Sequence, residues 1–264
     1  MSKVRISQLL KMKQSGEKIT AVTAYDASFS KLFHENGIEV ILIGDSLGMV
    51  LHGEDTTLGV SVEDIAYHTR AVRKGAADAF VIADMPFMSY PDPDTAGFHA
   101  AELMRAGANM VKMEGGEWLV DTVKHLTQQG IPVCAHLGLL PQQVHLIGGY
   151  RVQGKTKEQA DKLIEEALKL QAAGAQLLVV ECIPAALGKR FSEALHIPVI
   201  GIGAGADTDG QILVMHDMLG MNADYLPKFT RNFLVGHDSL AKAVQSYVAA
   251  VKDASFPGPE HTFS

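Results

Sequence analysis

The stretch Ala106-Gly107-Ala108-Asn109-Met110-Val111-Lys112-Met113-Glu114 contains the pattern that decides the fold. A glycine placed to end a helix is followed by a short apolar run, and that run ends in a glutamate. The segment AGAQLLVVE at residues 173–181 repeats this order, and in both segments the glutamate stands seven residues after the glycine. Runs that are apolar on both faces are typical of parallel strands covered by helices. The pattern therefore predicts repeated β/α units.

The same unit, an apolar run followed by a loop and an amphipathic helix, recurs along the chain. Seven clear apolar runs and a weaker eighth occupy residues 19–24, 40–43, 80–83, 110–113, 133–135, 177–180, 199–202 and 223–226. Eight such units in 264 residues favour one (β/α)8 TIM barrel over residues 1–264, with a short N-terminal helix and a C-terminal tail. A doubly wound open sheet has the same alternation and is the alternative.

Start and stop signals support the helices of these units. Ser61 with Asp64, and Thr156 with Gln159, have the spacing of capping boxes, in which a side chain and a backbone donor pair reciprocally. Glycines follow four helical patterns where a left-handed residue would end the helix. They are Gly37, Gly107, Gly130 and Gly174.

Composition narrows the classes of partner. A formal net charge of −7 disfavours nucleic acid and anionic membranes, because both repel an acidic chain. The two cysteines have no CxxC spacing, which argues against a disulfide framework and a cysteine zinc site. We find no apolar signal core near the N-terminus and no apolar run of about 20 residues. We therefore expect a soluble, cytoplasmic protein whose partners are small molecules and other protein chains.

Polar residues stand where the predicted strands end. They are Asp45, Ser46, Asp84, Lys112, Glu114, His136 and Glu181. In barrel enzymes the catalytic groups occupy the C-terminal strand ends, which converge on one mouth. Because side chains alternate along a strand, Lys112 and Glu114 point the same way, and inward if Val111 and Met113 pack against helices.

Four carboxylates in one mouth with a single lysine would repel each other, unless protonation or a cation neutralises them. Oxygen ligands without thiolates favour Mg²⁺, ahead of Mn²⁺ or Ca²⁺. A single carboxylate at a strand end often only caps the next helix or pairs at the surface. Polar side chains at five strand ends together favour a metal-dependent active site instead.

An ordered set of motifs makes the chain resemble the ketopantoate hydroxymethyltransferase family. The matching motifs are TAYD (23–26), GDSLG (44–48), ADMPF (83–87), VKMEGG (111–116), HLGL (136–139), GGY (148–150), VEC (180–182), GIGAG (201–205), DGQILV (209–214) and PKF (227–229). Each motif alone is weak, but the ordered set is specific.

This resemblance implies a reaction and its cofactor. 5,10-Methylenetetrahydrofolate would donate a hydroxymethyl unit to 3-methyl-2-oxobutanoate and give 2-dehydropantoate, a precursor of pantothenate and coenzyme A. The resemblance also implies Mg²⁺ and a cytoplasmic homo-oligomer, typically a decamer.

The resemblance further implies roles for individual residues. Asp45 and Asp84 would bind the metal, with Glu114 assisting directly or through water. Ser46 and Lys112 would bind the carboxylate and keto group of the substrate, which the metal ligands Asp45 and Asp84 also approach. Glu181 would be the general base.

The role of His136 stays open. It could bond the substrate keto oxygen, orient a ligand, or be held by a neighbouring backbone group.

Three other interpretations compete with this one. A lyase or mutase of the phosphoenolpyruvate mutase and isocitrate lyase type would also use barrel carboxylates to stabilise an enolate. A Schiff-base aldolase would use Lys112 as its nucleophile. A binding or scaffold barrel would carry no catalytic groups.

Overall fold

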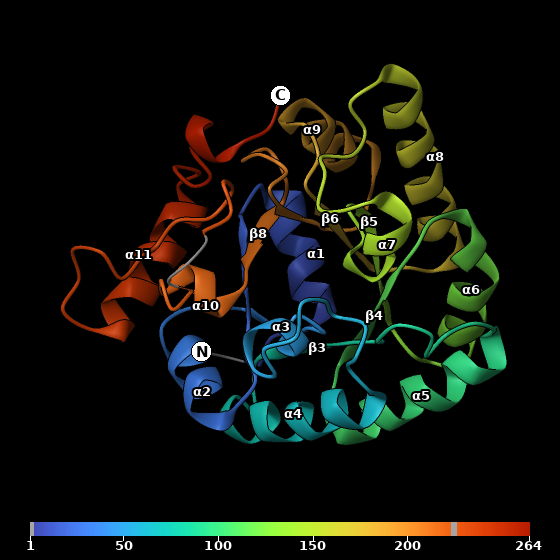
Figure 1. The fold of residues 1–264 in the computed structure, drawn as a ribbon, viewed down its shortest axis with the longest axis horizontal. Helices are drawn as coiled ribbons and strands as arrows, with labels where there is room; N and C mark the ends of the chain where they lie inside the picture. Colours follow the sequence, from blue (N-terminus) through green and yellow to red (C-terminus); the bar gives the residue numbers. More distant parts are fainter. Residues whose placement is uncertain (1–2, 223–225) are drawn as a thin grey trace.

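Eight parallel strands form a closed barrel in the computed structural model, which describes residues 3–222 and 226–264 (Figure 1). Each strand pairs with its neighbour in chain order, and β8 pairs with β1 to close the ring. The strands are β1 (Ile19–Thr23), β2 (Val40–Ile43), β3 (Phe80–Asp84), β4 (Met110–Glu114), β5 (Val133–Gly138), β6 (Leu177–Glu181), β7 (Val199–Ile202) and β8 (Gly210–Leu213). The predicted TIM barrel is confirmed, and the open sheet is excluded.

Helices surround this barrel and connect its strands (Figure 1). They are α1 (Ile6–Ser15), α2 (Ala27–Glu35), α3 (Leu47–Val50), α4 (Val62–Gly75), α5 (Pro93–Ala106), α6 (Val120–Gln128), α7 (Val144–Ile147), α8 (Lys157–Ala173), α9 (Ala185–Ala194), α10 (Met215–Met218) and α11 (Leu240–Lys252). Short 3₁₀ turns are η1 (Glu117–Leu119), η2 (Pro141–Gln143) and η3 (Pro259–His261). None of the helices in the described part of the chain is long and apolar enough to span a bilayer.

The eighth strand was predicted in the wrong place. Residues 223–225 of the predicted run 223–226 lie outside the described residues, and Leu226 is not in a strand. The strand that closes the barrel is β8, and only a short loop without a helix separates it from β7. This strand begins with a glycine and contains a glutamine, so its apolar signal is weak.

Alternation along the strands separates two apolar layers. Side chains such as Val111 and Met113 pack between the strands and the outer helices. The other set, which includes Met110 and Cys134, fills the barrel interior together with residues of α1. Because Met110 faces inward, Lys112 and Glu114 two and four positions later share its face. Their predicted inward orientation is confirmed.

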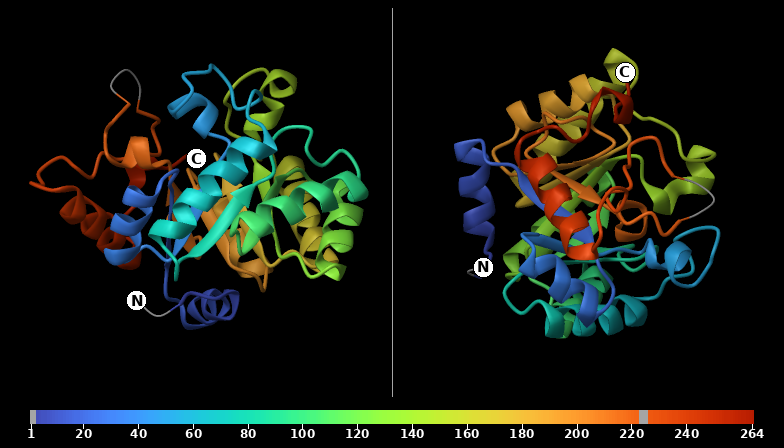
Figure 2. Two further views of the ribbon diagram at one scale, coloured as in Figure 1. Left: turned by 90° about the horizontal axis from the view of Figure 1, so that it is seen from below. Right: turned by 90° about the vertical axis from the view of Figure 1, so that its left-hand side faces the viewer.

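The two ends of the barrel differ in what covers them. Helix α1, dark blue in Figure 2, lies across one end, while α3 and α7 lie at the other, where the strands finish. Both predicted capping boxes form at the starts of α4 and α8. The four predicted glycines all have a positive φ. The loops at the mouth are therefore supported by well-capped helices.

Candidate active site

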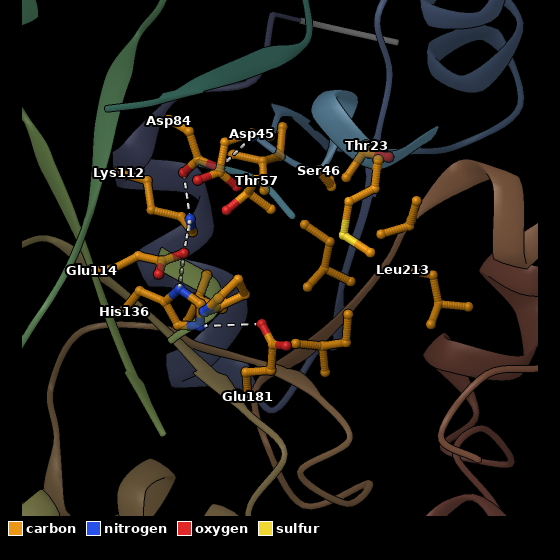
Figure 3. A pocket seen from close by; sticks show the side chains of 18 of the residues that line it. Thr23, Asp45, Ser46, Thr57, Asp84, Lys112, Glu114, His136, Glu181 and Leu213 are labelled. Atoms are coloured by element: carbon orange, nitrogen blue, oxygen red, sulfur yellow. Dashed lines mark hydrogen bonds and ion pairs between the residues drawn. The ribbon is translucent and has the colours of Figure 1, made fainter. Parts of the chain in front are cut away.

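Asp45 and Asp84 lie side by side at the ends of β2 and β3 (Figure 3). Their exposed fractions are only 4% and 2%. The backbone N–H of Asp45 donates to Oδ2 of Asp84 at 3.0 Å. The preceding Gly44 makes room for this contact, because a Cβ there would lie 3.4 Å from Oδ2 of Asp84 and 2.9 Å from Oγ of Ser46.

Lys112 links this pair to Glu114. Its ammonium group forms an ion pair with Asp84 and lies 3.5 Å from Oε1 of Glu114. All three side chains are buried, and Lys112 and Glu114 come from the inward face of β4. Lys112 thus stands between the two carboxylates, so Glu114 is separated from Asp84 by a cation of the protein itself.

His136 continues the chain of contacts toward Glu181 (Figure 3). Its Nδ1 lies 3.2 Å from Oε1 of Glu114, and its Nε2 lies 3.3 Å from Oε2 of Glu181. The second contact is an electrostatic contact and not a hydrogen bond. Both ring nitrogens face carboxylates, and no backbone group of a described residue bonds this side chain, unlike in one of the interpretations.

Glu181 points into the cavity from the side opposite Asp45 and Asp84 (Figure 3). It is less buried than the other charged residues of the site, with 15% of its side chain exposed. The cavity between these groups has a volume of about 150 Å³. A cavity of this size can enclose a small oxo acid with the carboxylate pair on one side and Glu181 on the other.

Burial and charge together shift the pKa values of the acidic pair. Burial raises the pKa of Asp45, and the charge of Asp84 raises it further, so it lies well above its ordinary value. Burial also raises the pKa of Asp84, although Lys112 opposes that shift. Without a cation, this pair favours keeping a proton.

The groups beside the acidic pair titrate in the opposite sense. Burial lowers the pKa of Lys112, but the charge of Asp84 and its neighbours outweighs burial and holds the pKa well above its ordinary value. Burial opposes ionisation of Glu114, yet Lys112 and His136 reverse this and lower its pKa. Burial lowers the pKa of His136, but Glu114 outweighs it and the result is about 9. Lys112 and His136 are therefore cations at neutral pH.

Gln142 is a buried residue of this site that the sequence did not reveal. It follows β5 in η2, and its Nε2 donates to Oδ2 of Asp45 at 2.8 Å and to the Met85 carbonyl at 3.0 Å. Its backbone N–H donates to Oε2 of Glu114 at 3.0 Å. The hydroxyl of Tyr90 donates to its Oε1. One glutamine therefore ties two of the predicted metal ligands together.

Ser46 lies at the mouth, at the start of α3. Its Oγ is 2.9 Å from the hydroxyl of Tyr25, which is itself buried. Tyr25 belongs to the TAYD motif, so the sequence pointed to this residue but not to its contact with Ser46. All seven predicted polar residues thus line one cavity.

The donor set suits a hard divalent cation, though it is incomplete without other ligands. No group of three or more His, Cys, Asp and Glu side chains among the described residues is arranged to hold a metal alone. Asp45 and Asp84 offer two buried carboxylates, while both oxygens of Glu114 already have partners. Mg²⁺ is commonly bound by one or two carboxylates, with substrate and water completing its shell.

Solved structures with similar folds include phosphonopyruvate hydrolase in complex with oxalate and Mg²⁺, with a TM-score of 0.63 and 15% identity over 84% of each chain. A second is 2,3-dimethylmalate lyase, a member of the PEP mutase/isocitrate lyase superfamily, with a TM-score of 0.59 and 14% identity over 95% of this chain and 96% of the other. At this identity the likeness concerns the fold alone.

Sequence comparisons go further. Proteins named 3-methyl-2-oxobutanoate hydroxymethyltransferase from Alteromonas mediterranea and Pseudoalteromonas translucida are 62% and 63% identical over the full length of both chains. The sequence profile described as ketopantoate hydroxymethyltransferase matches residues 3–259. The chain is therefore an enzyme, a hydroxymethyltransferase, and it belongs to the ketopantoate hydroxymethyltransferase family.

Proposed function

We propose that the enzyme transfers a hydroxymethyl group from 5,10-methylenetetrahydrofolate to 3-methyl-2-oxobutanoate, giving 2-dehydropantoate for pantothenate biosynthesis, with Mg²⁺ as its metal. One water molecule is consumed overall and supplies the hydroxyl oxygen. The observation that carries the proposal is the placement of Glu181 across a small cavity from Asp45 and Asp84. The family membership supports the same reaction.

Asp45 and Asp84 would hold the cation, with Glu114 acting through water because its oxygens are engaged. When bound, a divalent cation acts as a Lewis acid toward the keto oxygen of an oxo acid. The complex of phosphonopyruvate hydrolase with oxalate and Mg²⁺ supports this, since the two adjacent carboxylates of oxalate place oxygens much as a 2-oxo acid does.

Lys112 and Ser46 would position the substrate. An ammonium group has three donors, and Lys112 donates one of them to Asp84. Its charge also lies 3.5 Å from Oε1 of Glu114, and a remaining donor can reach a substrate oxygen in the same cavity. Ser46 adds a neutral donor whose orientation Tyr25 sets.

Glu181 would remove the proton from C3 of the substrate, since a base must face that carbon from the side away from the oxygens. The resulting enolate carbon attacks the one-carbon unit of the donor. Protonated His136 lies between Glu114 and Glu181, so it keeps the base oriented. His136 is thus a positioning residue in this mechanism.

The geometry disfavours a Schiff-base aldolase. That mechanism needs a neutral lysine amine, whereas the pKa of Lys112 is held well above its ordinary value, chiefly by Asp84 once burial is overcome. The lyase interpretation has only a fold-level likeness behind it.

The test is hydrogen exchange at C3 of 3-methyl-2-oxobutanoate in D₂O with Mg²⁺ and no folate, followed by proton NMR. We expect exchange that EDTA abolishes and that Glu181→Gln lowers at least about 100-fold, a range typical of a general base. Glu193→Gln, an exposed carboxylate on α9, is the matched control. Exchange that is indifferent to Glu181→Gln would overturn the assignment.

A cytoplasmic homo-oligomer, a decamer by resemblance, completes the proposal. Phe98 is 78% exposed beside a groove between α5 and α6, and an exposed aromatic side chain of this kind suits a protein interface. Sedimentation equilibrium should give ten times the chain mass of 28.4 kDa, and a monomer would contradict the assembly.

A further inference from the structure

A second cavity of about 400 Å³ adjoins the site described above. The two cavities share part of their walls, including Ser46, Tyr150 and Glu181. A molecule in the second cavity would therefore lie against the residue assigned as the base. A bound co-substrate there can present a reactive group to the carbon that Glu181 deprotonates.

The walls of the second cavity are largely apolar and partly aromatic. The apolar lining consists of Met49, Val50, Leu139, Val214, Pro227 and Phe229, joined by Tyr150. Phe229 is fixed against the backbone of Gly203, where a Cβ would lie 3.1 Å from its ring. The same aromatic ring meets Phe263 of the C-terminal tail at 6.4 Å. Such walls suit a flat ring system rather than a flexible polar chain.

Among the described residues, Asp217 is the second charged residue that lines this cavity, besides Glu181. It lies in α10, directly after β8, and is only 6% exposed. Within the described residues its side chain accepts one hydrogen bond, from Nδ2 of Asn222 to Oδ1 at 2.5 Å. A carboxylate can accept about four, so capacity remains for a ligand with adjacent N–H donors.

We propose that this second cavity binds the pterin ring of the folate donor, and that the Asp217 carboxylate accepts hydrogen bonds from its N3–H and 2-amino groups. The inference rests on the proposed function, because that reaction supplies a donor with this ring. The 2-aminopyrimidinone edge carries two neighbouring donors, which match the two oxygens of one carboxylate. Phe229 and Tyr150 provide the aromatic surfaces for the ring.

The charges around the cavity argue against other co-substrates. The charged lining residues in the described ranges are Asp217 and Glu181, and both are acidic. A nucleotide or coenzyme A would bring phosphates against these carboxylates without a cation to pair with them. A neutral ring with N–H donors meets no such repulsion.

The test compares two ligands on three proteins by isothermal titration calorimetry. The ligands are tetrahydrofolate and its 2-desamino-2-methyl analogue, and the proteins are wild type, Asp217→Asn and Asp238→Asn. Asp238 is an exposed carboxylate near α11 and serves as the matched control. Wild type and the control should bind tetrahydrofolate at least tenfold more tightly than the analogue. Asp217→Asn should bind tetrahydrofolate at least tenfold more weakly and distinguish the two ligands by less than twofold.

Equal affinity of wild type for both ligands would overturn the inference, whether or not the variant folds. Equal discrimination by wild type and Asp217→Asn would overturn it too. The C3 exchange assay contains no folate, so it reports on the proposed function separately. Exchange without ligand discrimination would reject the pterin site alone, while discrimination without exchange would reject the proposed reaction alone.

Discussion

Replacing Gln142 by leucine should weaken metal binding although no proposed ligand is changed. The side chain donates to Asp45 and to the Met85 carbonyl and accepts from Tyr90. Leucine has a similar volume, so the space is largely filled, but these buried groups lose their partner. The backbone N–H that holds Glu114 remains in the variant.

The expected cost follows from the groups left behind. A buried polar group that loses its partner costs about 1–3 kcal/mol, and the Asp45 carboxylate belongs to the upper part of that range. The Tyr90 hydroxyl retains a contact with the Glu114 carbonyl at 3.2 Å, so its loss is smaller. We expect a decrease of about 2–4 kcal/mol in the free energy of unfolding. Mg²⁺ affinity should fall about 10–100-fold, as is typical when the partner of a metal ligand is removed.

Two measurements check this expectation: urea unfolding, and Mg²⁺ titration of the C3 exchange rate. The neighbouring Gln143 makes no side-chain hydrogen bond to a described residue, so Gln143→Leu is the matched control. The control should change both quantities by less than the experimental error. A folded Gln142→Leu enzyme with Mg²⁺ half-saturation within twofold of wild type would refute the positioning role.

Three further perturbations test the fold and the metal dependence. Gly138→Ala should destabilise the protein by more than about 2 kcal/mol, because a Cβ there would lie 2.3 Å from the Glu181 carbonyl at a φ of +94°. Gly148→Ala, at a φ of +76° with open space around it, should cost only about 1 kcal/mol. Urea unfolding that gives the same loss of stability for both variants would contradict this difference. Ser61→Ala should cost about 1 kcal/mol of helix capping at pH 7. Hydrogen bonds from Ser61 hold the pKa of Asp64 below its ordinary value, so this loss should shrink as pH falls below about 4, and a constant loss would argue against the pair. Mg²⁺ at 100 times its dissociation constant should raise the free energy of unfolding by about 2.7 kcal/mol, and no shift of the melting temperature relative to EDTA would contradict metal binding to the folded state.

Local signals were sufficient to predict most of the barrel. Strands such as β4 are short apolar runs between a helix-ending glycine and a charged residue, and these cues lie within ten residues. β8 was missed because its first residue, Gly210, and its third-from-last, Gln211, interrupt the apolar run. Its identity depends on pairing with β1, almost 200 residues away in the chain, and no local pattern carries that information.

The same distinction applies to the site. Lys112 and Glu114 could be predicted because alternation along one strand fixes their common face. Gln142 could not, because its side chain acts on Asp45 from 97 positions away and follows a turn without a distinctive motif. Lys112 standing between Asp84 and Glu114 was likewise invisible, since the order of groups around a barrel mouth depends on side-chain conformation.

The most direct measurement is anomalous diffraction from crystals soaked with Mn²⁺ and 3-methyl-2-oxobutanoate. We predict one strong peak, with a carboxylate oxygen from each of Asp45 and Asp84 or their bridging waters at about 2–4 Å, the range of direct or water-mediated binding. The oxo acid should chelate the same ion, and Asp84→Asn crystals should lack the peak. A peak elsewhere in the molecule, or an oxo acid bound without contact to the ion, would contradict the proposed active site.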